Sequence, residues 1–274
     1  MSPDHPFKTT GLPPLFRIGA KPLDGAPRFV AGEDLSAYLA EKQRLAETRF
    51  DEIFLAEPDT DDAQREVLAL VCAETGNSAH EASVPPLWAA AQLVAEDLII
   101  MQRDADAWRL TAGALCFPSA WRLSEKICKP LDSLHAPVPG FAAGTRNAEI
   151  MARMFDALRP EAPIQRGNWS LYGDDELFHP DEADPDVPRF GPEGDRIFLR
   201  GERQTLSKLP ETGAILFTIR IFVTPLEALL AAEGGTDFAA QLSAELERFD
   251  ADQLAYKGLT SDRDWLIARL RQLT

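Results

Sequence analysis

One histidine stands where the chain has little conformational freedom, and its imidazole could hold a metal ion. His135 is followed by Ala136-Pro137-Val138-Pro139. Each residue that precedes a proline is pushed towards extended geometry, so the backbone after His135 has few accessible conformations. We therefore expect a stiff loop that aims the ring, as suits a metal ligand. A histidine that packs in a loop with a satisfied hydrogen bond explains the same spacing equally well.

The residues before His135 predict the elements that position it. Trp108 to Cys116 is apolar around the small residues Thr111-Ala112-Gly113-Ala114, which is typical of a half-buried strand approached closely by something flat. Pro118 ends this strand. Ser119 is suited to cap a helix that runs to about residue 128. The segment is expected to form a strand, a short helix and the loop of His135.

Several blocks of this sequence resemble one known family. They are L-C-F-P-S-A-W, E-K-I-C-K-P-L and L-H-A-P-V-P around His135, R-G-N-W from Arg166 to Trp169, L-R-G-E-R-Q-T-L-S-K-L-P, and A-I-L-F-T-I-R. Together they resemble the heme-dependent oxidative N-demethylases, which are the alpha-subunit-like proteins of dimethylamine monooxygenase. The resemblance covers roughly residues 10 to 258 and is specific for the family, not for one substrate.

This resemblance implies a fold, a cofactor and an activity. The implied fold is a PAS-like core that binds heme b. The implied activity is oxidative N-demethylation, in which O2 is used to oxidise a methyl group of a small secondary alkylamine such as dimethylamine, and formaldehyde is released. This sequence contains no flavin or iron–sulfur motif. Electrons from NADPH would therefore come through separate flavin/iron-sulfur reductase subunits.

A neutral imidazole should be the axial ligand of the implied heme iron. The chain has four histidines. His5 lies in a terminal segment, His80 follows in a polar loop, and His179 lies in an acidic segment where we expect it to be exposed. Elimination and the family motif both point to His135 as the metal ligand.

A cysteine thiolate is the rival axial ligand. Cys116 and Cys128 are the candidates, although both lie in patterns typical of a buried core. With Cys72 they make an odd count without Cys-x-x-Cys spacing, which indicates reduced thiols and fits a cytoplasmic protein. Fewer than four cysteines also argue against an iron–sulfur cluster.

The propionates of the implied heme require cations. Arg122, Lys126, Arg200 and Arg203 are the candidates, with the arginines first because guanidinium forks match carboxylates. Ordinary surface ion pairs are the alternative role for these side chains. Glu202 shares a strand face with Arg200 and is the candidate catalytic residue. It could hold a cationic amine, relay protons to bound oxygen, or only neutralise Arg200.

Composition restricts the partners. The chain has 274 residues, 45% of them hydrophobic, with 28 basic and 44 acidic side chains and a net charge of -16. Such a charge repels phosphate backbones and argues against nucleic acid. No apolar run approaches the ~20 residues of a membrane helix, and the N-terminus lacks an apolar signal region, so we expect a cytoplasmic protein.

The remaining pattern predicts an α+β fold in a single domain, residues 1–274. An antiparallel sheet of about five strands should be wrapped by helices from both termini. Strands are expected at 96–101, 108–116, 168–172, 196–204 and 214–223. Helices are expected at 33–55, 59–74, from 85, from 145 to 158, 225–232, 238–250 and 261–273.

The segment from Asp174 to Asp195 has a different composition. It holds nine acidic residues and four prolines, and predicts a solvated insertion or a mobile lid. Two other functions remain open beside the monooxygenase. They are a heme- or ligand-binding PAS-type sensor without turnover, and a family member that has lost heme and serves as an interaction partner.

Overall fold

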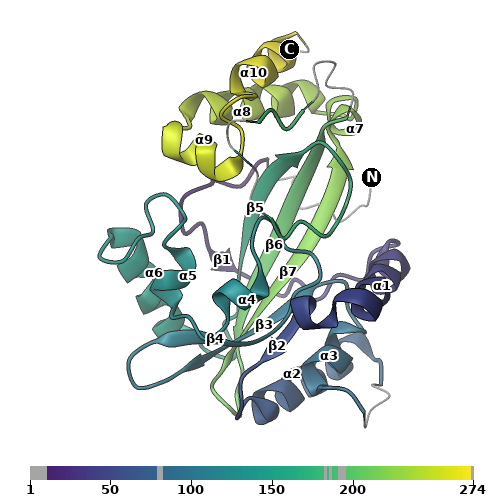
Figure 1. Cartoon of the computed structure of the whole chain (residues 1–274), viewed down its shortest axis with the longest axis vertical. Helices are drawn as coiled ribbons and strands as arrows, with labels where there is room; N and C mark the ends of the chain where they lie inside the picture. Colours follow the sequence, from purple (N-terminus) through teal and green to yellow (C-terminus); the bar gives the residue numbers. More distant parts are fainter. Residues whose placement is uncertain (1–10, 79–82, 182–183, 185–186, 191–195, 273–274) are drawn as a thin grey trace.

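A computed structural model describes residues 11–78, 83–181, 184, 187–190 and 196–272 (Figure 1). The strands in this part are β1 (Lys21–Pro22), β2 (Phe54–Ala56), β3 (Asp97–Arg103), β4 (Trp108–Ala114), β5 (Ile164–Tyr172), β6 (Phe198–Lys208) and β7 (Ile215–Pro225). The helices are α1 (Leu35–Ile53), α2 (Asp61–Thr75), α3 (Pro86–Ala91), α4 (Leu123–Lys126), α5 (Leu131–His135), α6 (Arg146–Ala157), α7 (Leu226–Leu230), α8 (Gly235–Arg248), α9 (Ala251–Lys257) and α10 (Arg263–Arg271).

One antiparallel sheet organises the molecule, in the order β1-β5-β6-β7-β3-β4-β2. The α+β class is confirmed. The strands expected at 96–101 and 108–116 pair as β3 and β4, and those expected at 196–204 and 214–223 pair as β6 and β7. The sheet has seven strands where about five were expected. The two extra strands are β1 and β2, whose two and three residues are too short to show a period-two pattern.

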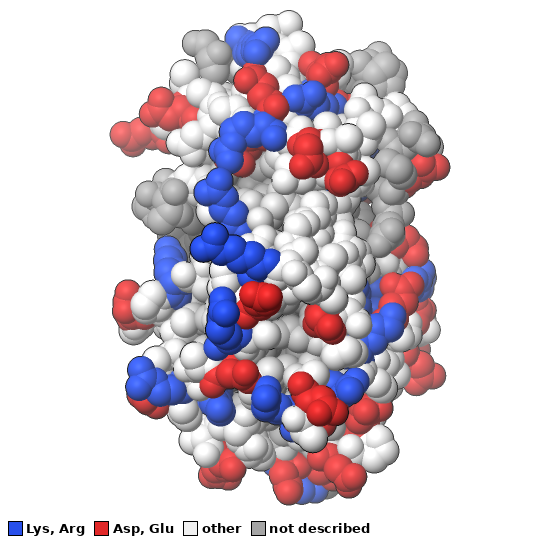
Figure 2. Space-filling model, turned by 90° about the vertical axis from the view of Figure 1, so that its left-hand side faces the viewer, with Lys and Arg blue, Asp and Glu red and all other residues white. Residues whose placement is uncertain are grey.

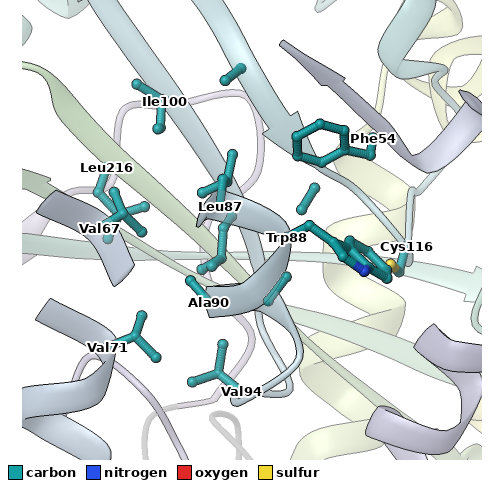
Figure 3. Packing of buried hydrophobic residues seen from close by; sticks show 14 of the residues in the cluster. Phe54, Val67, Val71, Leu87, Trp88, Ala90, Val94, Ile100, Cys116 and Leu216 are labelled. Carbon is teal, nitrogen blue, oxygen red and sulfur yellow. The ribbon is translucent and has the colours of Figure 1, made fainter. Parts of the chain in front are cut away.

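The N-terminal helices cover one face of the sheet. Leu98 and Ile100 of β3 and Leu216 of β7 point to this face and pack against Leu87 and Val67 of the helices α3 and α2 (Figure 3). All five side chains are fully buried. At about 1.5–3 kcal/mol for each buried aliphatic side chain, this layer is a main source of the stability of the sheet.

Two further groups of helices lie against the other face and the far end of the sheet (Figure 1). Helices α4 to α6 pack on Ile99, Met101 and Leu110. Helices α7 to α10 pack on Trp169 and Leu171 of β5. The N-terminal segment before β1 runs along the outer strand, where Trp169 Nε1 donates to the carbonyl of Pro13 at 3.2 Å.

The region around His135 differs from the expected helix and loop. The helix predicted from Ser119 to about residue 128 is reduced to the four residues of α4. His135 is not in a stiff loop, because it ends a separate short helix, α5. Pro130 is the N-cap of α5 rather than the end of the preceding helix. A proline at a helix start is favourable because its missing N–H would have no partner there.

Described residues of the acidic segment 174–195 contact the body of the protein. Phe190 is buried and stacks on Trp265, with ring centroids 6.2 Å apart. His179 was expected to be exposed, but its side chain is 18% exposed and its ring lies 4.3 Å from that of Tyr172. These aromatic side chains anchor the segment, which its overall composition did not indicate. No helix in the described ranges is long and apolar enough to cross a membrane.

Candidate functional site

A cavity of about 250 Å³ lies between the sheet and the helices α5, α6 and α9. Its apolar wall comprises Ile99, Met101, Leu110, Leu131, Leu134, Val138, Phe141, Met151, Met154, Phe155, Leu206, Phe217 and Ile219. Its polar side chains include Lys126, His135, Arg166, Asn168, Glu202, Gln204 and Lys257. Exposed Glu125, Pro137 and Tyr256 also line it, so the cavity opens to the surface at these residues.

Strand alternation places the sheet residues of this cavity on one face. Gln204 of β6 lies opposite Ile219 of β7, and Leu206 lies opposite Phe217. Phe217 in turn lies opposite Ile99 of β3. Successive side chains of a strand point to opposite faces, so this register brings alternate residues of three strands to the same surface. Phe217 and Ile219, which belong to the period-two pattern of β7, therefore form part of the sheet wall of the cavity.

Helix α6 supplies much of the opposite wall. Thr145 caps it, as its hydroxyl accepts from the N–H of Ala148, which confirms the predicted helix start. Met151 and Phe155 are buried on its inner face, one turn apart. Met151 and Met154 both line the cavity. Flexible thioethers suit a wall that must fit a ligand.

His135 presents a neutral imidazole to the cavity. Its Nδ1 lies 2.9 Å from the carbonyl oxygen of Leu131, one turn back in α5. Burial lowers the pKa of His135 to about 4, and the positive charges of Arg166 and Lys126 act in the same direction. At neutral pH the ring is uncharged, and a proton on Nδ1 for the Leu131 carbonyl leaves Nε2 as the basic nitrogen.

A polar wall faces this apolar part of the cavity. Neighbouring strands provide it, because Arg166 of β5 lies opposite Gln204 of β6 and Asn168 lies opposite Glu202. Gln204 Nε2 donates to Glu202 Oε2 at 2.7 Å. Glu202 is only 5% exposed.

Lys257 closes the polar wall from helix α9. Its Nζ donates to Asn168 Oδ1 at 3.1 Å, to the carbonyl of Trp169 at 2.7 Å and to Ser170 Oγ at 3.2 Å. Burial lowers the pKa of Lys257 to about 8, against the charge of Glu202, which raises it. Lys257 is therefore still largely protonated at neutral pH.

Three of the four predicted propionate partners lie away from the cavity, and only Lys126 lines it. Arg122 pairs with Asp181 and Glu52 near the surface. Arg203 points to the other face of β6, where it donates to the carbonyls of Pro27 and Arg28. Neither side chain lines the cavity, because residue type alone does not tell on which side of the sheet a cation lies.

Arg200 has a structural environment rather than a ligand-binding one. It is 1% exposed, and its Nη2 donates to the carbonyls of Phe117, Pro118 and Leu177 at 2.9–3.0 Å. It shares a strand face with Glu202 as predicted, yet within the described ranges the hydrogen bonds of its guanidinium go to Ser119 and to backbone carbonyls. The proposed neutralisation of Arg200 by Glu202 is therefore not a direct contact.

The strand of Trp108 and the strand that follows Ala214 are not neighbours in the sheet. Strand β3 lies between β4 and β7. Leu123 of α4 packs directly on Gly113. A Cβ added at Gly113 would lie 2.8 Å from Leu123 Cδ1, so the missing side chain makes room for Leu123. Small residues on a strand admit any close neighbour, so their presence did not indicate a ligand.

Neither candidate cysteine lines the cavity. Cys116 is buried in the cluster on the opposite face of the sheet, where burial raises the pKa of its thiol. Cys128 was expected in the core but is exposed, and its Sγ donates to Glu57 Oε1 at 2.6 Å. His179 lies outside the cavity lining as well. The predictions for His5 and His80 concern positions outside the described residues.

Arg166, Asn168, Gln204 and Lys257 were missed as candidates. Arg166 and Asn168 stand in the R-G-N-W block, whose alternation marks both as one face of a strand. Lys257 was missed because helix α9 was not predicted. Its start carries a readable signal, since Asp250 accepts from the N–H of Gln253 while the Gln253 side chain accepts from the N–H of Asp250.

Together these residues form a cavity with one neutral imidazole on an apolar side and cations on a polar side. The face with α5, α6 and α9 also carries a band of Lys and Arg side chains, despite the acidic composition of the chain (Figure 2). Among the residues that the structure describes, no group of three or more His, Cys, Asp or Glu side chains could hold a metal ion by itself.

The chain belongs to the family described as haem-dependent oxidative N-demethylase, alpha subunit-like, whose model matches residues 73–267. The match spans more than two thirds of the chain and includes β3 to β7 and every strand and helix residue of the cavity wall. It confirms the resemblance found in the sequence. The N-terminal Leu15 and Phe16, which also line the cavity, lie outside the matched range.

Proposed function

We propose that this protein is the heme-containing oxygenase component of an oxidative N-demethylase that acts on a small secondary alkylamine such as dimethylamine. The observation that carries this proposal is the neutral imidazole of His135 on the wall of an apolar cavity whose other wall holds Glu202. The family of the chain supports the same chemistry. One PAS-like domain over residues 1–274 would carry the whole site.

The residues of the cavity fit heme b. An apolar macrocycle needs an apolar wall, and its iron needs a neutral nitrogen. Its propionates need cations, and Arg166 Nε in this wall is a buried donor that has no hydrogen-bond partner among the described residues. The cavity volume of about 250 Å³ is close to the lower end of the ~300–1,000 Å³ of ligand pockets, and its opening lets a larger ligand reach the surface.

His135 would bind the iron through Nε2. Its Nδ1 is already held by the carbonyl of Leu131, which fixes the ring as metal-binding histidines require. Lys126, which lines the cavity and donates to the carbonyl of Leu134 at 3.0 Å, would provide a positive charge for a propionate. When bound, heme supplies the oxidising centre that activates O2.

Glu202 would bind the substrate. A dialkylamine is a cation at neutral pH, and a carboxylate that is 5% exposed and held by Gln204 is a suitable partner for its N–H groups. Oxidation of the methyl group gives a hydroxymethyl amine, whose C–N bond breaks to release formaldehyde and the demethylated amine. Glu202 would accept the hydroxyl proton in that step. One oxygen atom leaves in formaldehyde and the other in water.

The two electrons that this balance requires would come from NADPH through a separate flavin/iron-sulfur reductase. The family description as alpha subunit-like supports the existence of partner subunits.

The test is an absorption titration of the purified chain with hemin, followed by turnover of dimethylamine with NADPH and a reductase. We expect a Soret band that saturates at one equivalent, and formaldehyde in step with dimethylamine consumed. A chain that stays spectrally bare would refute heme binding. A heme-loaded chain that makes no formaldehyde from any small methylamine would favour the PAS-type sensor instead.

A further inference from the structure

Arg166 holds a hydrogen-bond donor that nothing in the described structure satisfies. Its Nε is buried and has no partner, and its Nη2 makes one long contact of 3.5 Å to the carbonyl of Arg17. Burial lowers the pKa of Arg166, against the charge of Glu202, but a guanidinium stays protonated at any physiological pH. Arg166 as a whole is half-buried, but its buried and unused Nε donor costs free energy unless a hydrogen-bond acceptor binds it.

Asn168 and Lys257 lie next to Arg166 on the same wall. All three line the cavity, and Asn168 is two residues from Arg166 on the same face of β5. Asn168 Oδ1 accepts from Lys257, so the Nδ2 group of this amide is the part left to donate. The three donors of Lys257 are all used, so its contribution to a ligand is its charge.

Glu202 does not neutralise this cluster by direct contact. In the described part of the chain, the Lys257 ammonium donates to Asn168, Trp169 and Ser170, and Arg166 Nη2 contacts the carbonyl of Arg17. The hydrogen bond to Glu202 Oε2 comes from Gln204. Its charge still affects both cations, since it opposes the fall of their pKa values. Two cations and one carboxylate leave one positive charge in a largely buried wall.

We propose that Arg166, Asn168 and Lys257 form a subsite that binds the carboxylate group of a ligand. A planar carboxylate matches the donor fork of a guanidinium, and a single negative charge balances the excess charge of this wall. A phosphate dianion would meet repulsion from Glu202.

Two ligands could bring this carboxylate. One is the propionate of a heme. The other is an N-methyl amino acid, whose cationic nitrogen would lie on Glu202 and whose carboxylate would lie on Arg166. The inference deepens the proposed function, because it names the group that the polar wall binds.

The experiment compares the full chain with Arg166→Gln, which keeps a polar side chain but removes charge and fork. Arg166→Lys keeps the charge alone, and Arg153→Gln is the matched control, since Arg153 is exposed and outside the cavity lining. Four probes are titrated: hemin, hemin dimethyl ester, N-methylglycine and dimethylamine. Absorption follows the two hemins, and calorimetry on the heme-free chain follows the two amines. Thermal melts establish that each variant is folded.

The pattern of affinities identifies the source of the carboxylate. If propionates bind here, Arg166→Gln lowers the affinity for hemin at least about tenfold, which is ~1.4 kcal/mol, and leaves the affinity for hemin dimethyl ester unchanged. If the substrate carboxylate binds here, the same variant lowers the affinity for N-methylglycine by a similar factor and leaves the affinities for dimethylamine and hemin unchanged. Arg166→Lys should lie between wild type and Arg166→Gln, and Arg153→Gln should match wild type.

The subsite is refuted if folded Arg166→Gln binds hemin and N-methylglycine as wild type does, or if wild type binds neither probe. These results are separable from the proposed function. If wild type binds N-methylglycine but not hemin, the subsite is supported and the proposed heme enzyme is refuted. If wild type binds hemin, and Arg166→Gln changes the affinity for neither hemin nor N-methylglycine, heme binding is supported and the subsite is refuted.

Discussion

Replacing His135 by alanine tests the central assignment of the site. Among the residues that the structure describes, the side chain makes one hydrogen bond, between Nδ1 and the carbonyl of Leu131, and its ring lies 6.3 Å from that of Phe141. The short helix α5 is held by Leu131, which is 6% exposed and belongs to the apolar cluster. His135→Ala should therefore remove the nitrogen ligand while α5 stays in place.

The structural cost of His135→Ala should be modest. Loss of one hydrogen bond to a backbone carbonyl costs about 0.5–1.5 kcal/mol, and a partly buried ring adds about as much again. We expect a loss of roughly 1–3 kcal/mol in the free energy of unfolding, within the ordinary range for point mutants. Hemin affinity should fall by more than about tenfold, or ~1.4 kcal/mol, because the apolar wall alone would hold the macrocycle.

Absorption spectroscopy checks this, with urea denaturation for stability. His135→Ala should shift the Soret band, and free imidazole should partly restore it by entering the space left by the ring. His179→Ala is the matched control, because His179 is also partly buried but pairs with Asp174 outside the cavity lining. A wild-type heme spectrum in His135→Ala would show that the ligand lies elsewhere, and the thiols of Cys116 and Cys128 would then be examined.

Three further substitutions separate structural from ligand-binding roles. Arg200→Met leaves the buried carbonyls that Arg200 serves without a donor and should cost at least about 3 kcal/mol in urea melts, while hemin affinity of the folded fraction stays the same. Burial raises the pKa of Asp97 to about 6 from 3.8. The contribution of Asp97 to the free energy of unfolding is therefore fully present below pH 3.8 and is lost as the pH rises through 6. Relative to Asp97→Asn, wild type should gain about 1 kcal/mol between pH 7 and pH 5, and equal changes in both proteins would contradict this. Asp250→Ala removes the cap of α9 and should lower the free energy of unfolding by about 1 kcal/mol. It should also lower the affinity for N-methylglycine or hemin, as Arg166→Gln does. Unaltered urea melts would mean that the cap is not needed.

Local sequence patterns were sufficient for most of the elements. The alternation of Ile215, Phe217 and Ile219 predicted β7, and Thr145 marked the start of α6. Each of these signals lies within one element, so no knowledge of the partner strands was needed. The two edge strands were not predictable in this way, since Lys21–Pro22 and Phe54–Ala56 exist only because β5 and β4 pair with them.

The candidate site was predictable in part. His135, Lys126 and Glu202 were selected from residue type and family blocks, and all three line one cavity. Arg122 and Arg203 were selected by the same reasoning and do not line it. The difference is the position of each side chain on the sheet or surface, which depends on long-range packing.

Register explains why the cavity has one polar and one apolar side. On the cavity face, β5 and β6 carry Arg166, Asn168, Glu202 and Gln204, whereas the next two strands, β7 and β3, line the cavity with Phe217, Ile219, Ile99 and Met101. Each strand alone shows only ordinary alternation. Paired in this order, the four strands place a charged half-face beside an apolar half-face under α5 and α6. A ligand that fills the cavity must therefore be amphipathic, with an apolar body and a charged end, and both heme and an N-methyl amino acid meet that requirement.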